Sequence, residues 1–169
     1  IVIQPTIFDD ERGYFFESYN EDEFIKAGII CHFTQDNQSK SQKGVLRGLH
    51  FQNPPYAQGK LVRVISGSVL DVAVDIRQNS PTYGQHFSIE LTERNKTMLW
   101  IPPGFAHGFA TIENNTIFSY KCTNLYNKES EKCIFWNDQN LKIDWQLNSP
   151  ILSEKDMKGT PFQDFISLF

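Results

Sequence analysis

Two of the four histidines stand among residues that could support acid–base chemistry. His50 lies in the segment GVLRGLHFQ, residues 44–52, and His107 lies in IPPGFAHGF, residues 101–109. An imidazole titrates near neutral pH, so either side chain can accept and return a proton. For each segment taken alone, a hydrogen-bonded core or surface histidine is the commoner interpretation. Any chemistry therefore depends on which other side chains the fold brings to these two rings.

A metal site is one alternative, because Pro102-x-Gly104-x-x-His107 is similar to the second metal motif of cupins, which are small β-barrels. A cupin metal site needs three or four ligands, normally a His-x-His pair, a Glu and the histidine of the second motif. The His-x-His position here reads His50-Phe51-Gln52, so the second ligand is missing. We therefore predict that the protein binds no metal.

The elements that must position the histidines are short strands. Two β-branched runs between Lys60 and Arg77 flank Ser66-Gly67-Ser68, which predicts a hairpin. In the second run, one face carries Leu70, Val72, Val74 and Ile76, and the other carries Asp71, Ala73, Asp75 and Arg77. Further strands are predicted at residues 85–91, 98–101, 105–112, 116–123 and 132–136. Short helices are predicted at 153–157 and at 21–27, the latter with Asn20 as N-cap and Gly28 as C-cap. This pattern indicates a single, mainly antiparallel β domain over residues 1–169, either a sandwich or a barrel.

Composition and charge exclude several classes of function. The net charge of −4 provides no basic surface for nucleic acid, and no apolar run approaches the length of a membrane span. The three cysteines show no Cys-x-x-Cys spacing, which fits a reducing compartment. The chain opens on Ile1-Val2-Ile3 with no signal-peptide pattern, so we expect a cytoplasmic protein.

Nine motifs occur in a defined order along nearly the whole chain. They are FDDERGYFFE (8–17), QDNQS (35–39), LRGLHFQ (46–52), AQGKLVR (57–63), DVAVDIR (71–77), SPTYG (80–84), IPPGFAHGF (101–109), the segment 120–126 and WND (136–138). In this combination the chain resembles the dTDP-4-dehydrorhamnose 3,5-epimerase family of the cupin superfamily. The departures are small: Trp145-Gln146 replaces the family's usual Trp-Pro, and the N-terminal strand is shorter.

The resemblance implies a cupin-type antiparallel jelly roll with a few short helices, acting as an isomerase in dTDP-L-rhamnose biosynthesis. The family inverts C3 and C5 of dTDP-4-dehydro-6-deoxy-D-glucose, and both carbons flank the C4 ketone. Such chemistry needs a base, a stabiliser for the enolate and an acid, but no redox cofactor or metal.

The resemblance also implies catalytic roles for five residues. His50 is the base, and Asp138 is expected to hold its imidazole. Lys60 would stabilise the enolate, Tyr120 would return the proton, and Asp71 would position Lys60 or a tyrosine hydroxyl. Other interpretations stay open from the residues alone: an Asx turn for Asp138, a solvated lysine for Lys60 and a packed aromatic for Tyr120.

The remaining expected roles concern substrate binding and assembly. Arg47 and Arg12 would bind the diphosphate together with Glu17, and Gln35 and Asn37 would supply neutral hydrogen bonds. Phe15 or Phe16 would stack on thymine, His107 would line the sugar pocket, and Tyr126 is the second candidate for the acid. The 12–17 segment crosses a subunit interface in the family, which implies a homodimer.

Three other functions are compatible with part of this sequence. A relative that epimerises only C3 or only C5 would share the same base, but would often alter a tyrosine. A cupin 3,4-ketoisomerase would lack the full set of motifs. A cupin that only binds a sugar nucleotide would have at least one broken catalytic position, and none is evident here.

Overall fold

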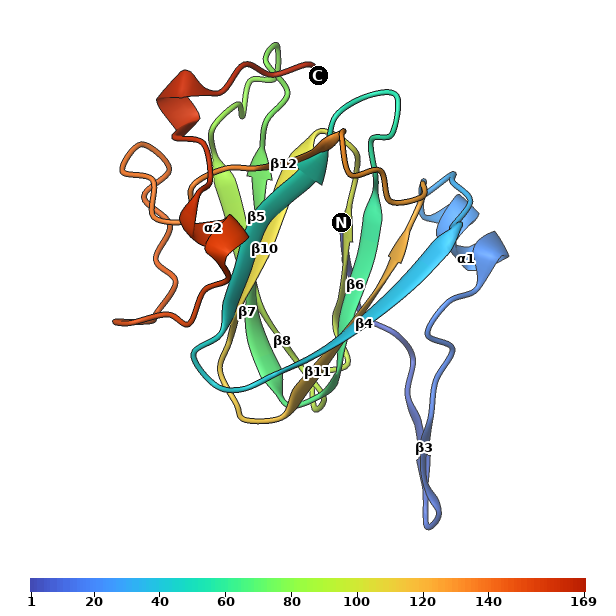
Figure 1. The fold of residues 1–169 in the computed structure, drawn as a ribbon. Coiled ribbons are helices and arrows are strands. Elements are labelled where there is room, and N and C mark those ends of the chain that lie inside the picture. The colour runs from blue at the N-terminus through green and yellow to red at the C-terminus, as the bar shows by residue number, and fades with distance from the viewer.

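The computed structural model describes residues 1–169 and contains two five-stranded sheets that face one another (Figure 1). The first sheet has the strand order β1 (Val2–Ile3), β9 (Met98–Ile101), β6 (Lys60–Ser66), β11 (Thr116–Cys122) and β4 (Gln35–Ser41). The second has the order β12 (Glu131–Cys133), β5 (Leu46–Gln52), β10 (Phe105–Thr111), β7 (Ser68–Asp75) and β8 (His86–Thr92). Every strand pairing is antiparallel, which confirms the predicted jelly roll.

A short hairpin and three short helices complete the structure. Strands β2 (Phe8–Asp10) and β3 (Gly13–Phe15) pair only with each other, and Figure 1 shows this hairpin projecting away from both sheets. Helix α1 spans Glu21–Lys26, α2 spans Glu154–Met157, and the 3₁₀ helix η1 spans Phe162–Asp164. No helix has both the length and the apolar character that crossing a bilayer requires.

The core between the sheets is built from the inward faces of both. The buried side chains are Val62, Val64, Leu99, Ile101 and Phe118 from the first sheet, and Val69, Ala73, Leu91 and Phe109 from the second. Every residue of β7 is buried, so the face that carries Asp71 points into the sandwich rather than to solvent. A carboxylate in that position needs a buried partner.

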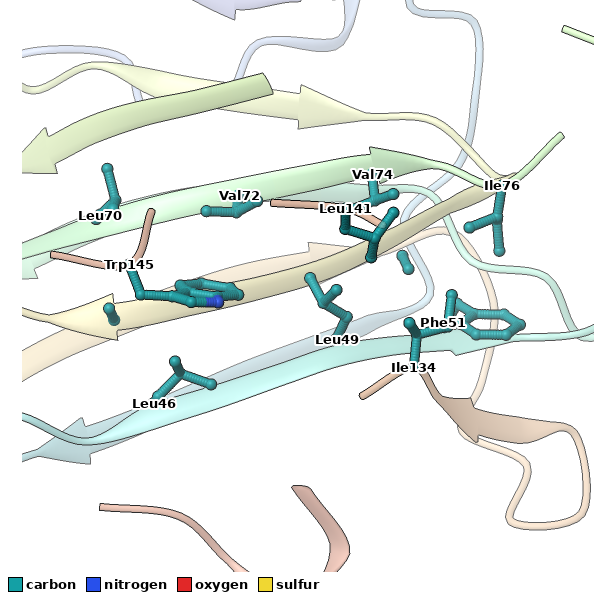
Figure 2. Packing of buried hydrophobic residues seen from close by; sticks show 12 residues of the cluster. Leu46, Leu49, Phe51, Leu70, Val72, Val74, Ile76, Ile134, Leu141 and Trp145 are labelled. Atoms are coloured by element: carbon teal, nitrogen blue, oxygen red, sulfur yellow. The ribbon is translucent and has the colours of Figure 1, made fainter. Parts of the chain in front are cut away.

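A second apolar layer lies on the outer face of the second sheet. Figure 2 shows Leu141 and Trp145, from the segment after β12, packed over Leu49 and Val72. The indole of Trp145 also donates a 2.8 Å hydrogen bond to the carbonyl of Trp136. The C-terminal segment therefore covers this sheet and brings α2 beside β5 (Figure 1).

The predicted hairpin at Ser66-Gly67-Ser68 is wrong. Strands β6 and β7 follow one another in sequence but belong to different sheets, so the chain turns a corner at Gly67. Gly67 has a φ of +82°, and a Cβ there would lie 2.3 Å from Thr116 Oγ1. Two β-branched runs around a glycine fit such a corner as well as a hairpin, because a glycine permits either turn.

The other predicted strands are confirmed within a few residues, but β2, β3 and β5 were not predicted, and neither was β4. Its sequence QDNQSKS contains no apolar residue, although alternate side chains are partly buried. Both predicted helices are present, with Asn20 and Ser153 as their N-caps.

Candidate active site

A bulge in β5 places Arg47 and His50 on the same inward face. Arg47 pairs with Phe109 and His50 with His107, so Gly48 and Leu49 lie opposite the single residue Gly108. In a regular strand, residues three apart would point to opposite faces, and the extra residue corrects this. Gly48 has a φ of +128°, and a Cβ would lie 2.4 Å from the Gly108 Cα, so only glycine fits.

Two adjoining cavities open between the sheets beside this bulge, and both are lined by His50, Lys60 and Tyr120. The first, about 300 Å³, is called here the Arg47 cavity and also contacts Arg47, His107, Lys155 and Asp156. The second, about 370 Å³, is called the Tyr126 cavity and also contacts Gln35, Asn37, Tyr126 and Glu131. His50 and His107 come from the second sheet, while Lys60 and Tyr120 come from the first. Acid–base groups therefore surround this space from two sides.

The carboxylate next to His50 is Asp156, from α2. His50 Nε2 lies 2.6 Å from Asp156 Oδ1, and the Asp156 side chain is only 3% exposed while that of His50 is 27% exposed. Asp156 also accepts hydrogen bonds from Gly48 N and from the Ser153 hydroxyl. Burial alone would raise the pKa of Asp156, but His50 and Ser153 together hold it below its ordinary value. The carboxylate is therefore ionised and fixed beside the ring.

The expected contact between His50 and Asp138 is wrong. Asp138 Oδ1 accepts hydrogen bonds from the backbone N–H groups of Asn140 and Leu141, and Oδ2 accepts one from Phe162 N at 2.7 Å. The Asx turn, left open from the sequence, is the observed arrangement, and it ties two loops of the C-terminal segment together. Sequence reasoning missed Asp156 because Ser153-Glu154-Lys155-Asp156 was interpreted only as the start of a helix.

Asp71 contacts His107 rather than Lys60 or a tyrosine. His107 Nε2 and Asp71 Oδ2 are 2.9 Å apart, and both side chains are buried. Burial lowers the pKa of His107 even though Asp71 opposes that shift. The ring is therefore neutral at neutral pH and faces the Arg47 cavity as a fixed polar group.

Lys60 lies at the boundary of the two cavities. Its ammonium donates a 3.3 Å hydrogen bond to the carbonyl of His50, which links the two sheets. Burial lowers the pKa of Lys60, while the nearby carboxylates of Asp71 and Glu131 oppose that change. The solvated-lysine interpretation is wrong, because Lys60 is half-buried between the sheets and its ammonium bonds to the backbone of the candidate base.

The two candidate tyrosines differ in position and in hydrogen bonding. Tyr120 borders both cavities, and its hydroxyl makes no hydrogen bond to the protein. Burial raises the pKa of Tyr120, which keeps its proton in place at neutral pH. Tyr126 borders only the Tyr126 cavity and is 54% exposed, and its hydroxyl donates a 2.9 Å hydrogen bond to Glu131 Oε2.

Polar side chains from β4, β12 and α2 complete the walls. Gln35 and Asn37 are hydrogen-bonded to each other and line the Tyr126 cavity, as the sequence led us to expect. Glu131 and Lys155, which the sequence analysis did not single out, form an ion pair at the edge of both cavities. Burial would raise the pKa of Glu131, but Lys155 and Tyr126 hold it below its ordinary value.

The 12–17 segment does not reach the cavities within one chain. Arg12 forms an exposed ion pair with Asp10 on the projecting hairpin, and Glu17 accepts hydrogen bonds from Asn20. Phe8, Tyr14 and Phe15 are all more than half exposed. These expected binding residues therefore lie apart from His50 and its neighbours.

The metal prediction rested on too few donors. From the sequence, only histidines and a glutamate were considered as ligands. The structure also brings Cys133 and Asp156 to His50, and the donor atoms of these three residues all lie within 4.8 Å of one another. The prediction that the protein binds no metal is therefore untested, and a metal bound at these three residues would overturn it.

A jelly roll in which a partly exposed histidine, a buried aspartate, a half-buried lysine and a tyrosine with an unpaired hydroxyl line one cavity has the groups of a cupin-type acid–base enzyme. Comparison with known proteins agrees with that class. Residues 1–164 match the family described as dTDP-4-dehydrorhamnose 3,5-epimerase, and the chain belongs to this family.

Individual relatives support the assignment. The chain is 51% identical to the dTDP-4-dehydrorhamnose 3,5-epimerase of Shigella flexneri over 165 residues, which cover 97% of this chain and 91% of the relative. It superimposes with a TM-score of 0.93 on the Legionella pneumophila dTDP-6-deoxy-D-glucose-3,5-epimerase in complex with dTDP-4-keto-L-rhamnose, at 49% identity over 96% of this chain and 87% of that one. A 3'-monoepimerase from Streptomyces bikiniensis has the same fold at 28% identity, with a TM-score of 0.90 over 96% and 83% of the two chains. The fold alone therefore does not distinguish one epimerisation from two.

Proposed function

We propose that the protein inverts C3 and C5 of dTDP-4-dehydro-6-deoxy-D-glucose to give dTDP-4-dehydro-L-rhamnose. The observation that carries this proposal is the close His50–Asp156 pair on one wall of a cavity whose other wall holds Lys60 and Tyr120. Both reacting carbons flank the same ketone, so one such site can treat them in turn.

His50 acts as the base. To accept a proton, the ring must carry its own hydrogen on the nitrogen that faces Asp156, because an ionised carboxylate only accepts. Nε2 faces Asp156, and Nδ1 makes no hydrogen bond to the protein, so Nδ1 is the nitrogen that takes the proton from carbon. Asp156 fixes this tautomer and stabilises the imidazolium that forms.

Lys60 and Tyr120 complete the reaction from the first sheet. Loss of the α-proton places negative charge on the ketone oxygen, and a buried cation offsets such charge more strongly than an exposed one. Tyr120 keeps its proton through burial and lies on the wall away from His50, so it can return a proton to the opposite face of the carbon. Inversion requires that change of face.

Arg47 and Lys155 give the acidic chain a local positive region for the diphosphate. Both border the Arg47 cavity, and a guanidinium can hold phosphate oxygens with two parallel hydrogen bonds. Gln35, Asn37 and Tyr126 line the neighbouring cavity, which we assign to the nucleoside.

The protein works as a homodimer in which the β2–β3 hairpin of one subunit completes the site of the other. The apolar Phe8, Tyr14 and Phe15 are exposed within one chain, and Arg12 and Glu17 lie away from the cavities of their own subunit. We place the protein in the cytoplasm, because its three cysteines are all free thiols.

The main test is hydrogen exchange with solvent. The protein is incubated with the substrate in D₂O, and deuterium at C3 and C5 is followed by NMR. We expect label at both carbons, and rhamnose configuration after a downstream reductase has acted with NADPH. Label at one carbon only would support the mono-epimerase alternative, and no label would contradict the proposed reaction.

The role of the acid is tested by removing one hydroxyl at a time. Tyr120→Phe should slow product formation while His50 still exchanges substrate hydrogen with solvent, because only the return of the proton is lost. Tyr126→Phe is the matched control and should alter mainly KM. Product formation by Tyr120→Phe at the wild-type rate would contradict its role as the acid.

The dimer is tested by subunit complementation. Arg12→Ala and His50→Asn are mixed after separate purification and allowed to exchange subunits. If the hairpin crosses to the partner, a mixed dimer contains one complete site, and activity should recover to about a quarter of the wild-type value. No recovery in mixtures shown by mass to contain mixed dimers would contradict the crossing.

A further inference from the structure

The register of the second sheet places a thiol directly beside the candidate base. Cys133 on β12 pairs with His50 on β5, and cross-strand partners project their side chains from the same face of the sheet. Asp156 approaches the same ring from α2. A nitrogen, a sulfur and a carboxylate oxygen, each from a different element, therefore converge within 4.8 Å of one another.

This set of donors matches the preference of one metal ion in particular. Zinc binds Cys, His and carboxylate ligands at about 2.0–2.3 Å in tetrahedral sites, which sets the ligand atoms about 3–4 Å apart. To reach that spacing, the 2.6 Å between His50 Nε2 and Asp156 Oδ1 must widen, and a donor pair at the 4.8 Å limit must close by about 1–2 Å. His50 Nε2 is also buried and makes no hydrogen bond to a group other than Asp156, so once the ring hydrogen shifts to Nδ1 the nitrogen is available to a metal.

We propose that His50, Cys133 and Asp156 bind Zn²⁺ as an inhibitory site, with three protein ligands and a fourth ligand supplied by water. The metal binds the Nε2 lone pair, so the ring hydrogen moves to Nδ1 and occupies the nitrogen that would take the proton from carbon. Asp156 then becomes a metal ligand instead of the partner of the ring. The thiol releases its proton on binding, and no bond to the substrate changes. The inhibitory consequence rests on the proposed role of His50 as the base, but metal binding itself does not.

Binding is measured first, independently of turnover. Co²⁺ serves as a coloured probe, because a thiolate ligand gives it a charge-transfer absorption that nitrogen and oxygen ligands do not. We expect one equivalent of Co²⁺ to give this band in the wild type and in Cys31→Ser, and Zn²⁺ to bleach it. Cys133→Ser should lack the band, while a band that persists in this variant would overturn the site.

Inhibition is then measured with the same proteins. Cys133 has no part in the proposed proton transfers, so Cys133→Ser should keep its basal turnover. Because the substitution removes one of three metal ligands, the variant should become at least about tenfold less sensitive to Zn²⁺. A chelator should restore the wild type. Equal Zn²⁺ sensitivity in Cys133→Ser, or Zn²⁺ binding without inhibition, would overturn the inhibitory role. If the wild type does not turn over the substrate, the proposed reaction fails, while the Co²⁺ band still decides the metal site.

Discussion

The site contains two histidine–aspartate pairs that are built in different ways. His50 and Asp156 join a strand to a helix of the C-terminal segment, and the His50 ring is partly exposed to the cavities. His107 and Asp71 join neighbouring strands of one sheet, and both side chains are buried. The contrast indicates that the first pair can exchange protons with a substrate, whereas the second provides a neutral ring in a fixed place.

The largest effect is expected from His50→Asn. The substitution removes the base with little change in volume, and the loss of general-base catalysis typically reduces turnover about 10²–10⁴-fold. Hydrogen exchange at C3 and C5 should fall together with turnover. The control is a circular dichroism melt, which should stay near that of the wild type; substantial remaining exchange would assign the base to another residue.

Asp156→Asn should have the next largest effect. An amide keeps the shape of the side chain but cannot stabilise an imidazolium by charge, so we expect a loss of about 10²-fold in kcat. Asp138→Asn is the matched control, because Asp138 only accepts hydrogen bonds from backbone N–H groups of the C-terminal segment. It should keep its turnover but lower the free energy of unfolding by about 1–3 kcal/mol. If Asp138→Asn lost turnover and Asp156→Asn lost only stability, Asp138 would be the partner of His50, as the sequence led us to expect.

Asp71→Asn should have a smaller effect, because the pair it belongs to positions rather than transfers a proton. The amide oxygen can still accept from His107, so we expect a decrease of about tenfold in kcat/KM. The pH profile of kcat should keep its shape, since His107 is already neutral. If the pH profile of kcat shifted in Asp71→Asn but not in Asp156→Asn, the His107–Asp71 pair would be the one that transfers the proton.

The smallest effect concerns stability in acid. The pKa of Asp156 is lower in the folded protein than in the unfolded chain, where it is about 3.9. Its contribution to stability is therefore present above about pH 4 and is lost as the pH falls through the lowered value. Urea unfolding curves of the wild type and Asp156→Asn should converge as the pH drops below about 4. A constant difference between the two would show that Asp156 contributes through packing alone.

Much of the fold could be predicted because the apolar pattern of most strands is strong. Strand β4 was missed because its inward residues line a cavity instead of a core, so polar side chains stand where a strand usually shows apolar ones. The corner at Gly67 was taken for a hairpin because local sequence does not reveal which sheet the next strand will join.

The same limit applies to the candidate site. His50, Lys60 and Tyr120 lie in well-defined sequence motifs on three strands, and the structure brings them together. The partner of His50 depends on how a long irregular segment returns to β5, and no local pattern contains that information. Asp138 and Asp156 are both plausible partners of His50 until the path of the chain between them is known.

The C-terminal segment has a consequence for how the protein becomes active. Synthesis proceeds from the N-terminus, so most of the two sheets can form before Asp156 leaves the ribosome. The segment then covers Leu49, Val72 and Val74 and delivers the carboxylate to His50 in the same step. An incomplete chain therefore lacks both the outer apolar layer and the carboxylate that pairs with His50. Under the proposed mechanism, a chain that ends before Asp156 keeps every strand but is inactive. Turnover of the substrate therefore shows that the C-terminal segment has been synthesised and has folded.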